Sequence, residues 1–192
     1  METLAAEATY EEVIRKSRFV CRAAPVESPE AAMAFLEAVR DPQASHNCWA
    51  YRVGDRYRFS DDGEPGGTAG RPILSAIEGQ GLDGVMVVVT RYFGGIKLGA
   101  GGLARAYGGV AAECLRRAPR RPLIRYRRVR LWLPFEAIEA FYRLLPAYGG
   151  EKLEEAYDEG ALFWVRLPED RLEAFAEALK DATRGVARVE VA

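Results

Sequence analysis

The segment TRYFGGIKLGAGGLARAY, residues 90–107, joins the end of a strand, a glycine-rich turn and the start of a helix. Before it, the apolar run GVMVVV at 84–89 is rich in β-branched residues and predicts a buried strand. After it, apolar side chains recur at helical spacing from Leu103 to Leu115, so the glycines should lie at or just before a helix N-terminus. Unpaired N–H groups there favour phosphate, sulfate or carboxylate. The segment therefore predicts an anion-binding turn between a strand and a helix.

Cations and aromatic side chains accompany these glycines. Glycine has no Cβ, so the backbone can approach a ligand closely. Arginine and lysine would neutralise an anion, and tyrosine can stack on a nucleic-acid base. The candidate binding residues of this segment are Arg91, Tyr92, Lys97, Gly99, Gly101, Gly102 and Arg105.

Familiar nucleotide-binding motifs do not fit the segment. A Walker loop requires Gly-Lys followed by Ser or Thr, which is absent. Gly99, Gly101 and Ala104 match the loose dinucleotide pattern, but the sequence RAPRRPLIR further on has no acidic residue for a ribose. The phosphate loop of the GHMP small-molecule kinases also precedes a helix, but its usual serines are missing. A tight turn whose glycines only allow the helix to pack on the sheet remains an alternative interpretation.

A second dense segment, SDDGEPGGTAGRP at 60–72, holds three carboxylates in a glycine and proline loop. Such carboxylates either hold Mg²⁺ beside a bound phosphate or cap turns and the helix that begins near RPILSAIEG. Their spacing is not that of an EF-hand. Asp61, Asp62 and Glu64 join the candidate ligand-binding residues, and we expect no metal and no cofactor.

His46 and Cys48 are two residues apart and would share one face of a strand. An imidazolium beside a thiol would lower the pKa of the thiol and favour nucleophilic catalysis. A half-buried strand cysteine is also commonly a small apolar residue, and nothing in the sequence shows this thiol to be activated. We expect no catalytic residue, and we include His46 among the ligand-binding candidates. With Cys21 and Cys114 far away, a zinc site is not expected.

Four segments resemble, in order, the IMPACT family and specifically its bacterial YigZ branch. They are RKSRFV at 15–20, SHNCWAYR at 45–52, SDDGEPGGTAGRPIL at 60–74 and VVVTRYFGGIKLGAGGLARAY at 87–107. Together they extend over most of the amino-terminal two thirds of the chain.

The resemblance implies an α+β protein of two domains. The amino-terminal domain of this family is similar to the second domain of ribosomal protein S-five, a fold also found in GHMP kinases and in domain IV of elongation factor G. The carboxy-terminal domain is ferredoxin-like, similar to domain V of that factor. Eukaryotic relatives act in translational control, where they compete for the ribosome-associated activator of a starvation-sensing kinase. For bacterial members, binding to nucleic acid or the ribosome is the usual proposal.

The residues support two domains independently. The segment RRAPRRPLIR at 116–125 combines two prolines with arginines and no acid, which is typical of a linker. Beyond it the apolar periodicity predicts the order βαββαβ, the ferredoxin-like split motif. We expect an IMPACT amino-terminal domain at 1–120, an arginine-rich linker at 121–127 and a ferredoxin-like domain at 128–192.

The net charge of −1 hides an uneven distribution. Residues 1–120 carry 15 basic and 15 acidic side chains, residues 121–130 carry five arginines and no acid, and residues 131–192 carry 7 basic and 13 acidic side chains. A nucleic acid would therefore meet the arginine-rich segment and the glycine turn. Alternatively, these arginines pair with carboxylates of the two domains.

These observations predict a non-enzymatic binding protein that engages nucleic acid or the ribosome and regulates translation. The alternatives are a metal-dependent enzyme acting on a phosphorylated small molecule, and a protein-interaction module. We expect a cytoplasmic protein with no membrane partner, because the sequence shows no signal peptide and no apolar run near eighteen residues. The three separated cysteines agree with a reducing compartment.

Overall fold

The computed structural model describes residues 1–191, which divide into a first compact unit, Met1–Leu123, and a second that begins at Ile124. Both units combine helices with antiparallel sheets, so the expected α+β class with two domains is confirmed. Among the described residues, no helix has the length and apolar character needed to cross a membrane.

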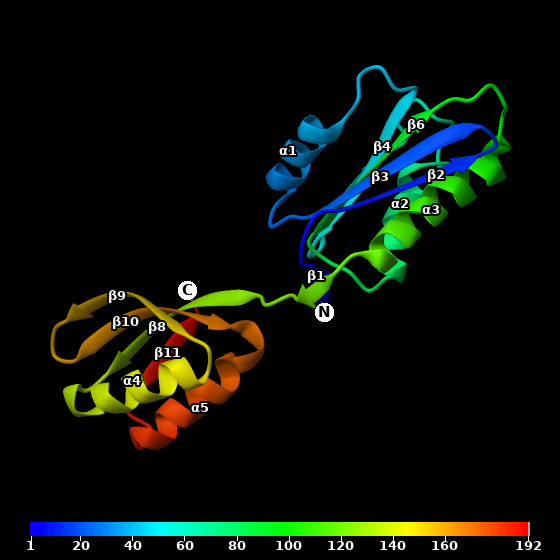
Figure 1. Cartoon of the computed structure of the whole chain (residues 1–192). Helices are drawn as coiled ribbons and strands as arrows, with labels where there is room; N and C mark the ends of the chain where they lie inside the picture. The colour runs from blue at the N-terminus through cyan, green and yellow to red at the C-terminus, as the bar shows by residue number, and fades with distance from the viewer. Residues whose placement is uncertain (192) are drawn as a thin grey trace. The chain divides into compact units, whose positions relative to one another are not determined.

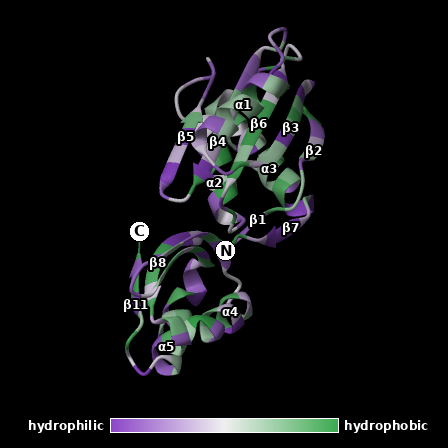
Figure 2. Ribbon diagram, turned by 90° about the vertical axis from the view of Figure 1, so that its left-hand side faces the viewer, coloured by the Kyte–Doolittle hydropathy of each residue, from purple (hydrophilic) through white to green (hydrophobic). Residues whose placement is uncertain are grey.

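The first unit is built on a five-stranded antiparallel sheet with the order β2-β3-β6-β4-β5. The strands are β2 (Ala8–Ile14), β3 (Ser17–Pro25), β4 (His46–Val53), β5 (Arg56–Ser60) and β6 (Val85–Tyr92). The apolar run predicted as a buried strand is β6, which occupies the central position. Figure 2 shows the hydrophobic colour along the central strands.

Helices cover both faces of this sheet (Figure 1). On one face lies α1 (Pro29–Val39), and on the other lie α2 (Gly70–Gly79) and α3 (Gly99–Arg117). Because side chains alternate along a strand, β6 contributes to two separate cores. Met86 and Val88 pack toward α1, whereas Val87 and Val89 pack in the core that α2 and α3 cover.

The arginine-rich segment is largely ordered. Residues 120–122 form β7 (Arg120–Pro122), which pairs with β1 (Glu2–Leu4) as a two-stranded ribbon of the first unit. The next strand begins at Tyr126, so only residues 123–125 of the expected linker lie outside strands.

The second unit is a four-stranded antiparallel sheet with two helices on one face (Figure 1). Its elements are β8 (Tyr126–Leu133), α4 (Ile138–Ala147), β9 (Glu151–Tyr157), β10 (Ala161–Pro168), α5 (Leu172–Ala182) and β11 (Arg188–Val191), with 3₁₀ turns η1 (Phe135–Ala137) and η2 (Glu169–Arg171). The strand order β11-β8-β10-β9 confirms the predicted ferredoxin-like motif. Phe141 and Phe163 stack in its core with ring centroids 4.2 Å apart.

Candidate functional site

The turn between β6 and α3 needs glycine at one position because the chain passes close to a neighbouring backbone. A Cβ on Gly94 would lie 1.9 Å from the carbonyl oxygen of Lys16, in the hairpin between β2 and β3. By contrast, a Cβ on Gly99, whose φ is +74°, would meet nothing within 4 Å. The packing interpretation therefore accounts for Gly94, while Gly99 borders open space.

The N-terminus of α3 is open to a ligand. The helix begins at Gly99, and the preceding residue, Leu98, provides no side-chain cap for the first N–H groups. Such uncapped N–H groups carry the positive end of the helix dipole. The prediction that these glycines lie at or just before a helix N-terminus is thus confirmed.

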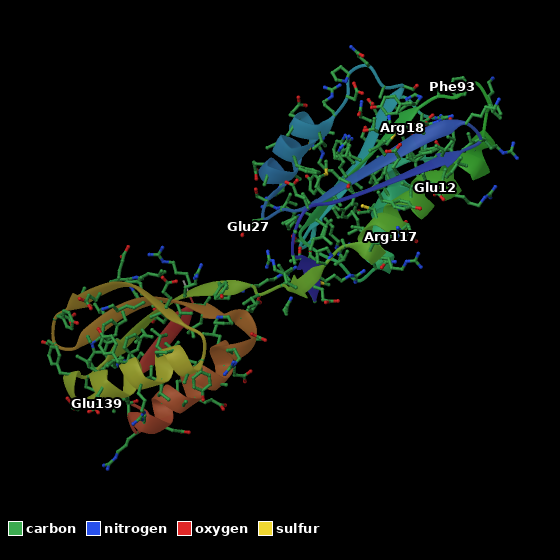
Figure 3. The ribbon with its side chains drawn as sticks, viewed as in Figure 1. Glu12, Arg18, Glu27, Phe93, Arg117 and Glu139 are labelled. Carbon is green, nitrogen blue, oxygen red and sulfur yellow. The ribbon has the colours of Figure 1, made fainter. Side chains whose placement is uncertain are left out.

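A pocket of about 480 Å³ lies beside this helix N-terminus. We call it the Arg91 pocket, and its lining residues are Ser45, His46, Glu64, Pro65, Arg91, Phe93, Lys97, Leu98, Gly99, Ala100 and Leu103. Phe93, labelled in Figure 3, lies in the loop between β6 and α3 and is 51% exposed. The pocket therefore joins β4, the loop before α2, the end of β6 and the start of α3.

A buried ion pair lies at this pocket. Arg91 is 5% and Glu64 is 8% exposed, and the Nη1 atom of Arg91 donates to Oε2 of Glu64 at 2.9 Å and to Oε1 at 3.1 Å. The hydroxyl of Tyr107 also donates to Oε2. Burial, together with the neighbouring Cys48 and Glu64, raises the pKa of Tyr107 well above its ordinary value and keeps the phenol a neutral donor. Three hydrogen bonds thus hold one carboxylate in place, which compensates for part of its desolvation.

His46 completes the polar part of the pocket. Its Nδ1 lies 2.8 Å from the carbonyl oxygen of Asp62. Because a carbonyl oxygen only accepts, Nδ1 carries a proton, and Nε2 faces Oε1 of Glu64 at 3.3 Å. The structure therefore brings together His46, Glu64 and Arg91, which the sequence had only suggested as separate candidates.

Asp61 and Asp62 support the loop. Oδ1 of Asp61 accepts from the N–H groups of Ala69 at 3.1 Å and Gly70 at 2.8 Å, and Oδ2 accepts from Gly67 at 2.9 Å. Burial raises the pKa of Asp61, but these backbone donors outweigh it, so the pKa lies below its ordinary value. Oδ2 of Asp62 accepts from the N–H of Asn47 at 2.6 Å. Asp61 thus caps the loop and the start of α2, the second of the two roles considered, whereas Asp62 binds a backbone N–H of β4.

The carboxylates of Asp61, Asp62 and Glu64 are not arranged as metal ligands. Three of the four carboxylate oxygens of Asp61 and Asp62 accept backbone hydrogen bonds, and both oxygens of Glu64 accept from Arg91. Within residues 1–191, no three side chains of the ligating types come together as metal ligands.

The side chain of Cys48 lies in the hydrophobic core of the first unit. It is fully buried, and its Sγ donates to the carbonyl oxygen of Asp61 at 3.1 Å. Burial raises the pKa of Cys48 to about 12. A thiol with this pKa is not the thiolate that nucleophilic catalysis needs.

Besides Asp61 and Asp62, four further candidates lie outside the lining of the Arg91 pocket: Tyr92, Gly101, Gly102 and Arg105. The Tyr92 hydroxyl donates to Asp41, and the Arg18 guanidinium lies 5.2 Å from the centroid of the Tyr92 ring. Gly102 and Arg105 line a separate hollow of about 270 Å³ together with Ile14, Arg15, Leu98 and Ala106. Arg105 folds over the first turn of α3, because its Nη1 lies 3.3 Å from where a Cβ of Gly101 would be.

Sequence reasoning missed two cations of this region. Arg15 and Lys16 form the tight turn between β2 and β3, with φ of 46° and 66°. Arg15 lines the same hollow as Arg105, and Lys16 contacts Gly94. In the sequence, the only sign that these residues belong to the site is that two basic residues are adjacent in a two-residue hairpin turn. Neighbouring residues do not show that this turn lies near α3.

We call these exposed side chains around the start of α3 the basic cluster: Arg15, Lys16, Lys97 and Arg105. Among residues 1–191, no carboxylate forms an ion pair with any of the four. Their charges are therefore available to an anion from outside the protein.

The arginines of residues 116–130 are placed differently. Arg116 and Arg117 both pair with Glu113 at the end of α3. The further pairs are Arg120 with Glu2, Arg127 with Glu169, Arg128 with Glu154 and Arg130 with Glu190. Six of the eight arginines in this segment thus have carboxylate partners, as the alternative interpretation of the segment expected.

Comparison with known families and proteins gives consistent results. The model of the Impact N-terminal domain matches residues 15–115, and that of a domain of unknown function (DUF1949) matches residues 132–186. An IMPACT family member in the pol 5' region of Thermus thermophilus is 54% identical over 179 residues, which is 93% of this chain and 99% of that protein. The IMPACT family member YigZ of Escherichia coli (strain K12) is 40% identical over 191 residues, covering 94% and 92% of the two chains.

A eukaryotic protein and a solved structure are also similar to this chain. The Protein IMPACT of Homo sapiens is 37% identical over 93 residues, which is 44% of this chain and 29% of that protein. A solved structure titled "Crystal structure of an hypothetical protein" has a TM-score of 0.75 and 36% identity, and the match covers 98% of this chain and 95% of the other.

Proposed function

Because the chain belongs to the IMPACT family, specifically to its bacterial YigZ branch, we propose that it is a non-enzymatic RNA-binding protein that acts on the ribosome or its RNA to regulate translation. The observation that carries the proposal is the basic cluster, four exposed cations that form no ion pair within residues 1–191, around an uncapped helix N-terminus. The similarity to the Protein IMPACT of Homo sapiens, together with the role in translational control that the family resemblance implies, supports the cellular role. The proposal includes a cytoplasmic location.

The basic cluster differs from the arginines of β8 in its ion pairing. A cation that already has a carboxylate partner must lose that partner before it binds a phosphate, which offsets part of the gain. Arg15, Lys97 and Arg105 have no such partner among the described residues, whereas Arg127, Arg128 and Arg130 do. Phosphates should therefore bind at the start of α3 in preference to β8.

Binding of a structured RNA at rising salt concentration tests the proposal. The variant Arg15→Gln, Lys97→Gln, Arg105→Gln removes three unpaired charges, and Arg127→Gln, Arg128→Gln, Arg130→Gln removes three paired ones. We expect the first variant to bind at least tenfold more weakly at low salt, with a slope of log affinity against log salt that is smaller by about 2. The second should retain most of the affinity.

Two outcomes would overturn the proposal. One is a wild-type protein with no salt-sensitive RNA binding, and the other is an equal loss in both triple variants. If the protein instead captured a polypeptide after nuclease treatment and bound no RNA, the same surface would serve a protein-interaction module.

A further inference from the structure

The Arg91 pocket and the basic cluster are neighbours. Lys97 belongs to both, and Leu98 lines both the pocket and the hollow that holds Arg15 and Arg105. An RNA strand bound along the basic cluster therefore passes the mouth of the Arg91 pocket. The inference about which group enters this pocket rests on the proposed RNA-binding function.

One donor of Arg91 has no partner among the described residues and remains accessible to solvent. Nε of Arg91 donates to Ser17 Oγ at 3.3 Å, and Nη1 donates to Glu64. Nη2 has no hydrogen-bond partner among residues 1–191, and solvent can reach it. The Arg91 side chain is only 6% exposed and lines the pocket. An acceptor on a ligand in this pocket would replace solvent at Nη2 with a direct hydrogen bond.

The rest of the pocket wall is apolar and aromatic. Pro65, Leu98, Ala100 and Leu103 surround the cavity, and Phe93 stands at its edge, half exposed. The position of Phe93 is supported from two sides, because its N–H donates to Ser45 Oγ at 3.0 Å and the Arg91 guanidinium lies 5.3 Å from the ring centroid. A volume of about 480 Å³ is within the range of about 300–1,000 Å³ that is typical of small-molecule sites.

The cationic part of the pocket lies at its rim. Lys97, Gly99 and Ala100 line the pocket and are exposed, and the uncapped N–H groups of α3 begin at Gly99. A ligand that matches all of these features has a flat ring with a hydrogen-bond acceptor on its edge and an anionic group attached a few bonds away. A nucleotide has this chemistry, because its base carries the acceptors and its phosphate the charge.

We propose that the Arg91 pocket holds one unpaired nucleotide of the bound RNA. The base lies against Phe93 and the apolar wall and accepts a hydrogen bond from Nη2 of Arg91, while its phosphate binds Lys97 and the N-terminus of α3. Stacking on an aromatic ring tolerates any base, so the pocket selects unpaired RNA and leaves sequence preference to the Arg91 donor.

Nucleoside 5′-monophosphates are the probe for this pocket, with inorganic phosphate as the comparison. In the full chain, we expect a monophosphate to shift the amide resonances of residues 93–103 and to bind at least tenfold more tightly than phosphate. The variant Phe93→Ala should weaken binding of both the monophosphate and a single-stranded RNA about tenfold, since base stacking contributes about 1–3 kcal/mol. Phe135→Ala is the matched control, because Phe135 is 50% exposed and lies in the second unit.

The variant Ala100→Phe provides a second test that does not depend on Phe93. Ala100 is exposed in the first turn of α3, so a larger side chain there can fill the pocket mouth without disturbing the core. It should abolish monophosphate binding and lower the affinity for single-stranded RNA more than for a fully paired duplex.

The outcomes separate the two proposals. If RNA binds with the expected salt dependence while monophosphates do not bind and both pocket variants behave as wild type, the pocket inference fails and the RNA-binding function stands. Equal affinity for phosphate and monophosphate would also overturn the inference, because the base would then add nothing. If monophosphates bind but no RNA does, the pocket serves a free nucleotide, and both the inference and the proposed function fail.

Discussion

Arg91 and Glu64 form an ion pair inside the first unit, and the residues lie 27 positions apart in the chain. The pair connects the end of β6 with the loop that precedes α2, and Tyr107 connects the same carboxylate with α3. Three segments that border the pocket are thus held by one buried carboxylate. Its contribution to stability can be measured separately from ligand binding.

Replacement of Glu64 by Gln should destabilise the first unit strongly. It leaves the Arg91 guanidinium buried without a counter-charge, and breaking a buried pair on one side typically costs about 3–5 kcal/mol. Hydrogen exchange of the β4 and β6 amides reports on this unit alone. Glu78→Gln is the control, because it breaks a partly exposed pair with Arg52 in the same unit and should cost less than about 1 kcal/mol. Equal effects of the two variants would show that the buried pair has no special role.

Gly94 and Gly109 should respond to alanine with opposite signs. A Cβ on Gly94 would lie 1.9 Å from Lys16 O, so the turn or the hairpin must move, and we expect a loss of more than about 1 kcal/mol in unfolding free energy. Gly109 lies within α3, where a Cβ meets nothing within 4 Å, so alanine should stabilise the helix by about 0.5–1 kcal/mol. Urea unfolding measures both. A neutral Gly94→Ala variant would contradict the close approach of the two backbones.

The local part of this architecture could be predicted from the sequence. The β-branched run before residue 90 and the helical periodicity after Leu103 depend only on neighbouring residues, so β6 and α3 were identified from them. The βαββαβ order of the second unit was found in the same way. In each case the burial of one face imposes a repeat that can be read directly from the chain.

The composition of the site could not be predicted in the same way. Arg15 reaches the start of α3 only because β3 pairs with β6, a contact between segments about seventy residues apart. Likewise, a carboxylate in a glycine loop can cap a helix or hold a metal, and only the positions of the backbone N–H groups around Asp61 decide between the two. Charge pairing of the arginine-rich segment also depends on β9 and β11, as the partners of Arg128 and Arg130 show.

Asp61 should make the stability of the first unit sensitive to acid. Its pKa is lower in the folded state than in the unfolded chain, so its stabilisation is present above the ordinary value of about 4 and is lost as the pH falls through the folded value. At pH 6, Asp61→Ala should cost about 1 kcal/mol, as the loss of a helix cap usually does. The difference from wild type should shrink between pH 5 and pH 2.

Urea unfolding at several pH values measures this effect. Substituting Phe for Trp132 and Trp164 leaves Trp49 as the fluorescent reporter of the first unit. Asp55→Ala, in the exposed turn between β4 and β5, is the control for the removal of a surface carboxylate from the same unit. A constant difference for Asp61→Ala would contradict the capping role.

The three cysteines should resist alkylation in the folded protein. Cys21, Cys48 and Cys114 are all buried, so the reagent has no access to them. At Cys48, burial also raises the pKa to about 12, which leaves almost no thiolate there at pH 8. Mass spectrometry after iodoacetamide treatment should show no label in native protein and three labels in denaturant. The variant Ser75→Cys, at an exposed position of α2, should take up one label under native conditions and so confirm that the reagent is active. Rapid native labelling of Cys48 would instead mean that its thiol is accessible and activated, and would reopen nucleophilic catalysis beside His46.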